Sequence, residues 1–276
     1  MQNWKYYNHA AIPKVTPHQV PDLSPIEDKS IWSIDGNRPL LARWTEDFDC
    51  GYETNWWYVI KDEPFDASLL KAKRRYEITK GEKNFEVRKI TPADHKKTLY
   101  DIQVAAFSAY PEKYRPTVEK QAFFSSIDGW DNYDAYGVFL RESGEMVGYS
   151  LLSSPLDGYV DFAVLRTKPQ YERLAVNAGF VAGILSFYKD FLANGGYISD
   201  GTRSINHETM FQDYLEKYFG FRKAYCRLRI RYNPKFGWLV KILYPFRKLF
   251  GLFDSINLIH QVHSILRMEE MTRETT

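Results

Sequence analysis

The chain has 276 residues, of which 44% are hydrophobic and 26% are charged, and its formal net charge is +2. These proportions are typical of a globular protein and exclude collagen, a continuous coiled coil and wholesale disorder. The sequence has no run of about 18 apolar residues, which argues against a membrane-spanning helix. Two cysteines exclude a disulfide framework, and the first residues show no signal pattern, so a cytoplasmic location is expected.

The near-neutral total conceals an uneven distribution of charge. Residues 1–66 hold 6 basic and 11 acidic residues, whereas residues 67–89 hold 8 basic and 3 acidic ones. Residues 217–248 hold 10 basic residues and no acidic one. Such basic clusters predict an anionic partner, which can be phosphate, nucleic acid or acidic lipid. The alternative is that the cations pair with the acidic N-terminal segment inside the fold.

Hydrophobic periodicity and turn residues predict the elements in chain order. Residues 1–65 are rich in Pro, Asp and Trp and predict an extended strap that ends in a strand at 56–60. Asp66 is a candidate N-cap for a helix that ends at Gly81. The following elements are expected at 85–90 (strand), 92–109 and 117–126 (helices), 135–140, 145–152 and 159–165 (strands), 170–192 (helix), 197–200 (strand), 206–219 (helix) and 224–232 (strand). A hairpin inside such an order predicts a mixed α/β sheet with antiparallel strands.

This order, together with two segments, resembles the GNAT acyltransferase superfamily. The segments are SLLKAKRRYEITKGEKNFEVRKI (68–90) and YLEKYFGFRKAYCRLRIRY (214–232), and they are most similar to the Fem-type branch, the peptidoglycan aminoacyltransferases and their relatives. The resemblance covers residues 66–232 and implies a GNAT-like, mainly antiparallel sheet flanked by helices. Residues 1–65 are then an N-terminal strap or partial subdomain, and residues 233–276 are a C-terminal amphipathic helical tail. The whole sequence is similar to GNAT-like proteins of bacterial surface-polysaccharide loci.

The resemblance implies an N-acyltransferase that modifies an amine of an envelope polysaccharide or peptidoglycan precursor. The donor would be acetyl-CoA, another acyl-CoA or an aminoacyl-tRNA, which is the only nucleic acid expected. The acceptor would be an amino sugar or amino-acyl group on a nucleotide or lipid diphosphate. In the superfamily a Gly-rich loop holds the donor pyrophosphate at a helix N-terminus. Here Val176 stands at the first glycine of that loop, and its β-branched side chain is predicted to obstruct a phosphate. This departure favours the alternative of a catalytically inactive GNAT-like scaffold at the membrane surface.

The densest polar stretch, ISDGTRSINHETMFQD (198–213), follows a short strand and is the candidate catalytic segment. Loops at strand ends often carry catalytic groups. Asp200 or His207 is a candidate base, whereas Arg203 and Asn206 are candidate substrate ligands. Asp161, in the middle of its strand, either faces the same cleft or pairs with an arginine. The structural alternative is a turn at Asp200 followed by helix capping. A cleft is expected between strands 159–165 and 197–200, with Asp200, Arg203 and His207 at its mouth.

Further cations are candidate ligands for an acidic acceptor. Arg74, Arg75 and Lys80 belong to the helix before the first core strand, and Arg222 begins the last one. Arginine suits a diphosphate because its planar fork donates two hydrogen bonds at once. In that last strand Arg227, Arg229 and Arg231 share one face, so either cross-strand acids or an anionic ligand must oppose them. The six histidines form no convincing metal-ligand set.

The tail KFGWLVKILYPFRKLFGLFDSINLIHQVHSIL (235–266) combines bulky apolar residues with lysine and arginine. Pro245 is expected to break it into two helices, neither of which could span a bilayer. Basic residues beside aromatic ones are typical of a helix that lies on anionic lipid. The sequence therefore predicts association with the inner membrane surface. The alternative is a helical pair that docks on the domain or on a second subunit.

Overall fold

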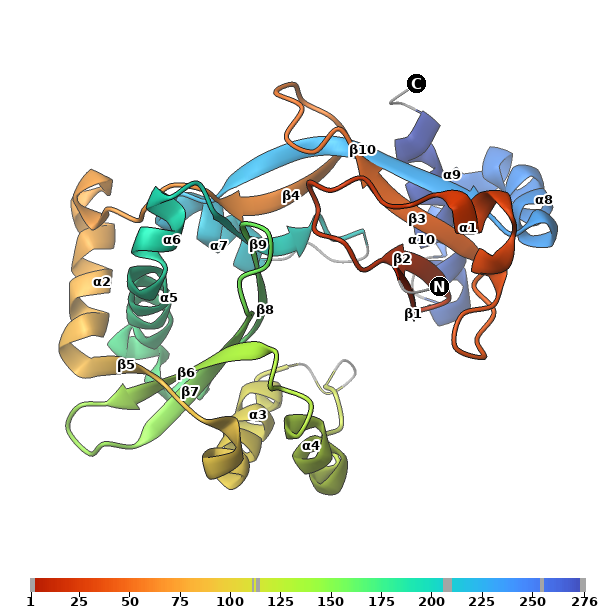
Figure 1. Cartoon of the computed structure of the whole chain (residues 1–276). Coiled ribbons are helices and arrows are strands. Elements are labelled where there is room, and N and C mark those ends of the chain that lie inside the picture. Colours follow the sequence, from red (N-terminus) through yellow and green to blue (C-terminus); the bar gives the residue numbers. More distant parts are fainter. Residues whose placement is uncertain (1–2, 111, 113–114, 206–209, 254–255, 274–276) are drawn as a thin grey trace. The chain divides into compact units, whose positions relative to one another are not determined.

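A computed structural model describes residues 3–110, 112, 115–205, 210–253 and 256–273 (Figure 1). The described residues form a mixed α/β fold in which helices flank mostly antiparallel strands, as the sequence predicted. The chain divides into two compact units, and each is discontinuous in sequence. The first comprises Met1–Tyr58, Thr202–Thr209 and Lys223–Thr276, and the second comprises Val59–Gly201 and Met210–Arg222. The domain boundaries expected at 65/66 and 232/233 stay a prediction.

The first unit contains strands that the sequence pattern did not predict. Hydrogen-bonded neighbours run in the order β1-β2-β3-β10-β4, with β2 parallel to β3 and β3 antiparallel to β10. The elements are β1 (Trp4–Tyr7), β2 (Ala10–Pro13), α1 (Ser24–Glu27), η1 (Ser30–Trp32), β3 (Leu41–Glu46), β4 (Trp56–Lys61) and β10 (Arg222–Tyr232). The segment expected to be a strap therefore supplies four strands, and its longest irregular stretches are residues 14–23, 33–40 and 47–55.

Strict alternation sorts the residues of β10 onto two faces. Cys226 and Leu228 are buried in a core with Trp56 of β4. On the other face Arg229 pairs with Glu46 at 2.7 Å, and Arg227 pairs with Asp47 at 3.4 Å. Acidic side chains on or next to the neighbouring strand β3 therefore oppose these two arginines. This arrangement confirms the first of the two alternatives that the sequence left open for them.

The C-terminal segment is helical and breaks at Pro245, as predicted, but it contains a further long helix. Its elements are α8 (Pro234–Leu243), η6 (Tyr244–Phe246), α9 (Arg247–Leu252) and α10 (Asn257–Arg273). Because proline at the first turn of η6 lacks an amide hydrogen, α8 cannot continue through it. Among the described residues, no helix is long and apolar enough to cross a membrane.

The second unit carries the end of β4 and the remaining strands, in the order β9-β8-β7-β6-β5. In chain order its elements are η2 (Ala67–Leu69), α2 (Ala72–Asn84), β5 (Phe85–Lys89), η3 (Pro92–His95), α3 (Lys96–Ser108), α4 (Lys120–Ile127), β6 (Tyr133–Leu140), β7 (Met146–Ser153), β8 (Tyr159–Thr167), η5 (Pro169–Leu174), α5 (Val176–Phe187), α6 (Lys189–Ala193), β9 (Tyr197–Thr202) and α7 (Met210–Phe219). Helices α3 and α4 pack on one face of this sheet, while α5 packs on the other with α2 beside it (Figure 1).

Two predicted helices differ from the observed ones, and both differences have local causes. Asp66 accepts a hydrogen bond from the Ser68 amide at 2.8 Å, so it caps the short η2 and not α2. The helix expected over 170–192 consists of η5, α5 and α6. Ala175 separates η5 from α5 with a φ of 61°, a left-handed conformation that cannot continue a right-handed helix.

Candidate functional site

A cavity of about 770 Å³ lies in the second unit where α2, α7 and the start of α5 meet. Strand β8 contributes Leu165 to its wall, and η5 contributes Arg173. The full lining comprises Lys73, Tyr76, Glu77, Lys80, Leu165, Glu172, Arg173, Ala175, Asn177, Ala178, Met210, Phe211 and Tyr214. A concave site of this size that combines apolar walls with a few charged groups is typical of small-molecule binding.

The N-terminus of α5 faces this cavity through Ala175, Asn177 and Ala178. The first amide groups of a helix lack intrahelical acceptors and lie at the positive end of the helix dipole, so this position favours an anion. The Asn177 side chain is fixed by a hydrogen bond from Thr167 of β8 at 2.8 Å. Val176 is fully buried and is not part of the cavity wall. The steric obstruction predicted for its β-branched side chain is therefore not seen.

The charged residues of the cavity wall give it a positive balance. Lys73 and Lys80 come from α2 and Arg173 comes from η5, whereas the acidic members are Glu77 and Glu172. Glu77 is also held by Arg74 at 2.5 Å, which offsets its charge. Three cations at a helix N-terminus are suited to one or more phosphate groups. The residues present thus fit a phosphate-bearing ligand such as coenzyme A, although the glycines of the GNAT-type loop are not present here.

Tyr214 brings a proton donor to the cavity wall from α7. Burial raises the pKa of its hydroxyl above the ordinary value, so the group stays protonated at neutral pH. Tyr218, one turn further along α7, is engaged differently. Its hydroxyl accepts a hydrogen bond from Arg74, and the guanidinium of Arg74 lies 3.4 Å from the centre of its ring. Tyr214 is therefore the tyrosine of this pair that is available to a ligand in the cavity.

Strands β8 and β9 hold a second group of candidate residues. They pair in parallel with Asp161 opposite Ser199, and the described ladder between them covers only Tyr159–Asp161. An extra residue at Ala163, against β7, shifts the register of β8 just after this ladder. Such bulges redirect a strand and are frequent next to active sites. Asp161 therefore lies where β8 departs from its regular register, and Asp200 follows its partner Ser199 in β9.

Asp200 has the most perturbed carboxyl group in this region. Burial raises its pKa from 3.8 to about 7, with a further contribution from the charge of Asp161 and an opposing one from Gln212. Gln212 also donates a hydrogen bond to the Asp200 carbonyl oxygen at 3.1 Å. Asp200 is not part of the cavity wall, but Gln212 lies between Phe211 and Tyr214 of α7, which are. A carboxyl group with a pKa near 7 can accept and release a proton at neutral pH.

The remaining candidates from the sequence occupy different environments. Of the α2 cations, Lys80 lines the cavity, whereas Arg75 donates to the Leu70 carbonyl at 2.6 Å. Arg222 pairs with Asp62 at 2.5 Å. Arg203 belongs to the first unit, where it donates to the Asn55 carbonyl at 2.7 Å and lies 4.2 Å from the Trp57 ring. Asn206 and His207 lie outside the described residues, and the catalytic and binding assignments stay predictions.

Sequence reasoning missed three cavity residues, Lys73, Arg173 and Tyr214, as site members. Lys73 lay within the recognised basic run, but nothing in the sequence shows which of its cations turn toward α5. Arg173 and Tyr214 lie 100 or more positions from Lys73, and no local pattern indicates that they meet it. Within the described part of the chain, no group of three or more His, Cys, Asp or Glu residues could hold a metal ion.

Comparisons with known proteins identify the fold. No family model matches the chain, and no curated protein matches it. The structure of L-PGS from Bacillus licheniformis is 10% identical, with a TM-score of 0.53, over 99% of this chain and 86% of that one. The structure of FemX is 8% identical, also with a TM-score of 0.53, over 80% of this chain and 81% of that one. At such identities the likeness concerns the fold, which is GNAT-like and of the Fem type, as the element order predicted.

Proposed function

We propose that the protein is a transferase that moves an acyl or aminoacyl group to an amine of a cell-envelope precursor. The observation that carries this proposal is the cationic cavity at the start of α5, whose wall includes Tyr214 of α7. Asp200 of β9 is outside that wall and is linked to α7 through Gln212. The shared fold with FemX and L-PGS supports the same class of reaction. The donor is a phosphate-bearing acyl carrier, either an acyl-CoA or an aminoacyl-tRNA.

The chain offers one group for each requirement of amine acylation. A bound donor supplies the activated carbonyl. Lys73, Lys80 and Arg173 hold its phosphates near the helix N-terminus. Asp200 in its ionised form removes a proton from the acceptor ammonium, directly or through water, so that the amine can attack. Tyr214 donates a proton to the departing oxygen or sulfur, because its raised pKa keeps the hydroxyl protonated.

Binding measurements with variants of the cavity test the donor site. Titration calorimetry with coenzyme A, and separately with an aminoacyl-tRNA, is done on the intact chain. Lys80→Ala and Arg173→Ala should each weaken binding of the true donor by about tenfold, the effect of losing one charge-assisted contact. Lys97→Ala is the matched control, because Lys97 is an exposed cation of α3 and is not part of the cavity wall.

Donor binding, measured together with acyl transfer, separates an active transferase from the catalytically inactive scaffold. An active transferase binds a donor and transfers the acyl group to an amino-sugar or amino-acyl acceptor, and Tyr214→Phe slows that transfer while leaving donor binding intact. The proposed cavity would be contradicted if the chain bound neither donor. It would also be contradicted if Lys80→Ala and Arg173→Ala bound the donor as well as Lys97→Ala does. Arg74→Ala with Arg75→Ala remains the test of the predicted acceptor diphosphate site.

We also propose that the transferase works at an anionic membrane surface through α8 and α9. Their outer face is unusually apolar for a surface, with Trp238 at 68% and Leu252 at 77% exposure. We call this face the α8–α9 surface, and its exposed apolar members are Trp238, Leu239, Ile242, Phe246, Leu249, Leu252 and Phe253. Contiguous apolar patches of this kind mark interaction sites more often than free surface.

The opposite side of these helices is fixed to the first unit, so the apolar face is not simply an undocked core. Phe236 packs against the core cluster and Val240 is buried, one helical turn apart. Arg247 pairs with Glu270 at 2.7 Å and lies 4.4 Å from the Tyr244 ring. The inward and outward residues therefore alternate with the helical period.

Charge favours lipid over a protein partner. Lys235, Lys241 and Lys248 are exposed beside the apolar residues. The sequence from residue 217 to residue 253 contains no Asp or Glu. Each lysine near an anionic bilayer contributes about 1 kcal/mol of binding free energy. A helix that carries aromatic and basic residues in this way lies in the plane of the lipid headgroups.

Vesicle co-sedimentation tests this surface. The chain should bind vesicles that contain phosphatidylglycerol at low salt, and much less those of phosphatidylcholine alone. Trp238→Glu and Leu252→Glu should each reduce binding several-fold, because they place a carboxylate in the apolar face. Leu69→Glu is the matched control, since Leu69 is 84% exposed but belongs to the second unit. Equal binding by all variants, or no binding to either kind of vesicle, would contradict the proposed membrane association.

A further inference from the structure

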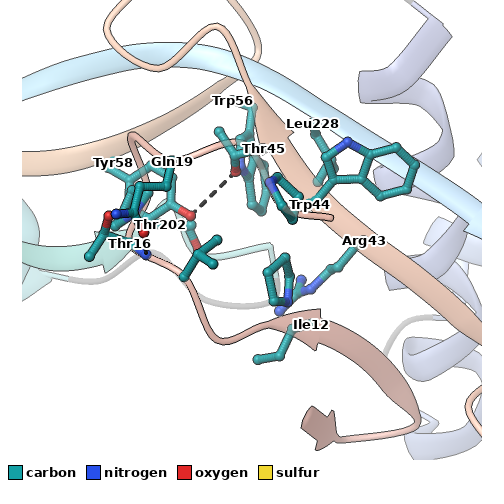
Figure 2. Close-up of a pocket in the computed structure, with 14 residues that line it drawn as sticks. Ile12, Thr16, Gln19, Arg43, Trp44, Thr45, Trp56, Tyr58, Thr202 and Leu228 are labelled. Carbon is teal, nitrogen blue, oxygen red and sulfur yellow. Dashed lines mark hydrogen bonds between the residues drawn. The ribbon is translucent and has the colours of Figure 1, made fainter. Parts of the chain in front are cut away.

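Among the described residues, the half-buried Arg43 of β3 has no acidic partner. Figure 2 shows its side chain reaching from β3 toward Ile12 of β2, along the wall of a cavity of about 180 Å³. Arg43 also lines a second cavity of about 470 Å³ in the same unit. In the described part of the chain its one hydrogen bond goes to the Met268 sulfur, from Nη1 at 3.6 Å. A thioether sulfur is a weak acceptor and leaves the positive charge unopposed.

Arg229 on the neighbouring strand β10 provides a comparison, because it is an arginine with a carboxylate partner. Arg43 is opposite Ile230 in the β3–β10 register, so Arg229 points to the other face of the sheet. There Arg229 donates to Glu46 at 2.7 Å. Burial lowers the pKa of Arg43, and the charges that oppose this effect come only from tyrosines, Tyr58 and Tyr7. Placing a guanidinium away from water without a carboxylate is unfavourable unless another anion approaches it.

Trp56, which lines the smaller cavity, carries a second donor without a partner among the described residues. Trp56 is 2% exposed, and its indole Nε1 is buried without a hydrogen-bond partner among the described residues. Buried indole N–H groups normally find an acceptor. Thr16 and Gln19, on the segment between β2 and α1, add polar side chains to the same wall. In the larger cavity Asn8 and Gln261 provide side-chain amides. The cavities thus contain donors and a cation, with aromatic and apolar walls around them.

We propose that Arg43 binds an oxyanion, either a carboxylate or a phosphate, of a small ligand that occupies these first-unit cavities. A guanidinium recognises both groups through two parallel hydrogen bonds. The carboxylate could belong to a free acid, and the phosphate to a free ester or to a lipid headgroup. This site lies wholly within the first unit and does not depend on the transferase reaction assigned to the second.

The proposal has a signature that a structural arginine would not show. Arg43→Met keeps the length and packing of the side chain but removes the unopposed charge. In chloride buffer this variant should therefore unfold at the same temperature as the unsubstituted chain or at a higher one. An arginine that the fold needs would instead give a clear decrease. Arg43→Lys keeps a cation without the planar fork and should retain partial binding.

Thermal unfolding and calorimetry with defined anions complete the test. Sodium phosphate, sodium acetate and glycerol 3-phosphate are compared with sodium chloride at equal ionic strength. At least one should raise the unfolding temperature of the unsubstituted chain, and Arg43→Met should weaken its binding at least tenfold. The identity of the effective anion distinguishes a carboxylate ligand from a phosphate, and glycerol 3-phosphate reports on a headgroup.

Arg229→Met is the matched control for this experiment. It removes a cation from the adjacent strand, on the opposite face, and leaves Glu46 without its partner. We expect it to lower the unfolding temperature and to leave the effect of the anion unchanged. The proposal is wrong if no anion stabilises the unsubstituted chain more than chloride does. It is equally wrong if Arg43→Met responds as the unsubstituted chain does, or if it unfolds at a clearly lower temperature in chloride.

Discussion

The carboxyl group of Asp200 links stability to pH in a direction opposite to that of most acidic residues. Its pKa is raised from 3.8 to about 7. Between these pH values the folded chain therefore keeps a proton that the unfolded chain has lost. The contribution of this group to the free energy of unfolding is therefore largest below about pH 4. It decreases as the pH rises through about 7, where the buried group must become charged.

Asp200→Asn should remove this pH dependence, because the amide resembles the protonated acid and cannot ionise. Compared with the unsubstituted chain, the variant should be equally stable below about pH 4 and more stable above about pH 7. Urea unfolding at both pH values measures the difference. A variant that is less stable at the higher pH would show that the ionised carboxylate is stabilised by a partner in the folded chain and is not destabilised by its burial.

The same substitution tests the role of Asp200 as a base. In the unsubstituted chain the transfer rate should rise with pH through about 7, as the carboxyl group ionises. Asp200→Asn should lower the rate by about 100-fold or more and remove this part of the pH profile. If the variant keeps both the rate and the profile, then another group, such as Asp161 or the undescribed His207, accepts the proton.

At the scale of elements, the contact between α2 and α5 depends on two glycines. A Cβ atom on Gly81 would lie 2.6 Å from the Gly179 nitrogen and 2.7 Å from the Ala175 carbonyl oxygen. A Cβ atom on Gly179 would lie 2.8 Å from the Gly81 carbonyl carbon. All these neighbours are backbone atoms, which cannot rotate away. The two helices can therefore approach closely only because both positions lack a side chain.

Gly81→Ala or Gly179→Ala should force α2 and α5 apart and lower the free energy of unfolding by about 1–3 kcal/mol or more. Because Lys73 and Lys80 reach the cavity from α2, donor binding should weaken as well. Gly129→Ala is the matched control, since its Cβ would meet only the Ser126 carbonyl oxygen at 3.5 Å. Chemical denaturation of the three variants decides this point, and equal stabilities would contradict the close contact.

At the scale of the whole molecule, the two units do not follow the order of the sequence. The contiguous segment 59–222 contains every residue of the second unit. The predicted domain 66–232 instead contains all of β10 but lacks Leu41, Trp56 and Met268, which pack against Cys226 and Leu228 of that strand. The apolar face of β10 would then be exposed to water, at a free-energy cost of about 25 cal/mol for each Å² of apolar surface.

Expression of both segments tests the division. Segment 59–222 should unfold cooperatively, because the hydrophobic core around Leu99, Ile102 and Tyr149 is complete within it. Segment 66–232 should aggregate or bind a hydrophobic dye. Circular dichroism with thermal unfolding distinguishes these outcomes. Cooperative folding of 66–232 alone would instead support the domain boundaries that the sequence suggested.

The sequence by itself determined those features that depend on residues close together along the chain. The alternation of residues 224–232 separated Cys226 and Leu228 from the arginines, and Pro245 broke the tail, because proline and side-chain periodicity act within one or two turns. The order of strands and helices from residue 85 indicated the fold. In residues 1–55 the sequence pattern did not predict the strands β1, β2 and β3, which are short and leave little periodicity to detect. The strand expected at 56–60 is present as β4.

Only the tertiary structure decided which of the recognised residues meet. The partner of Arg229 lies 183 positions away, and Val176 turns into the core and not toward the cavity. Lys80 faces the cavity while Arg75 of the same helix binds carbonyl oxygens. The unopposed charge of Arg43 likewise becomes visible only once every neighbouring element is in place. Local pattern fixes which way a side chain points from its own element, but the groups that it encounters there come from distant parts of the chain.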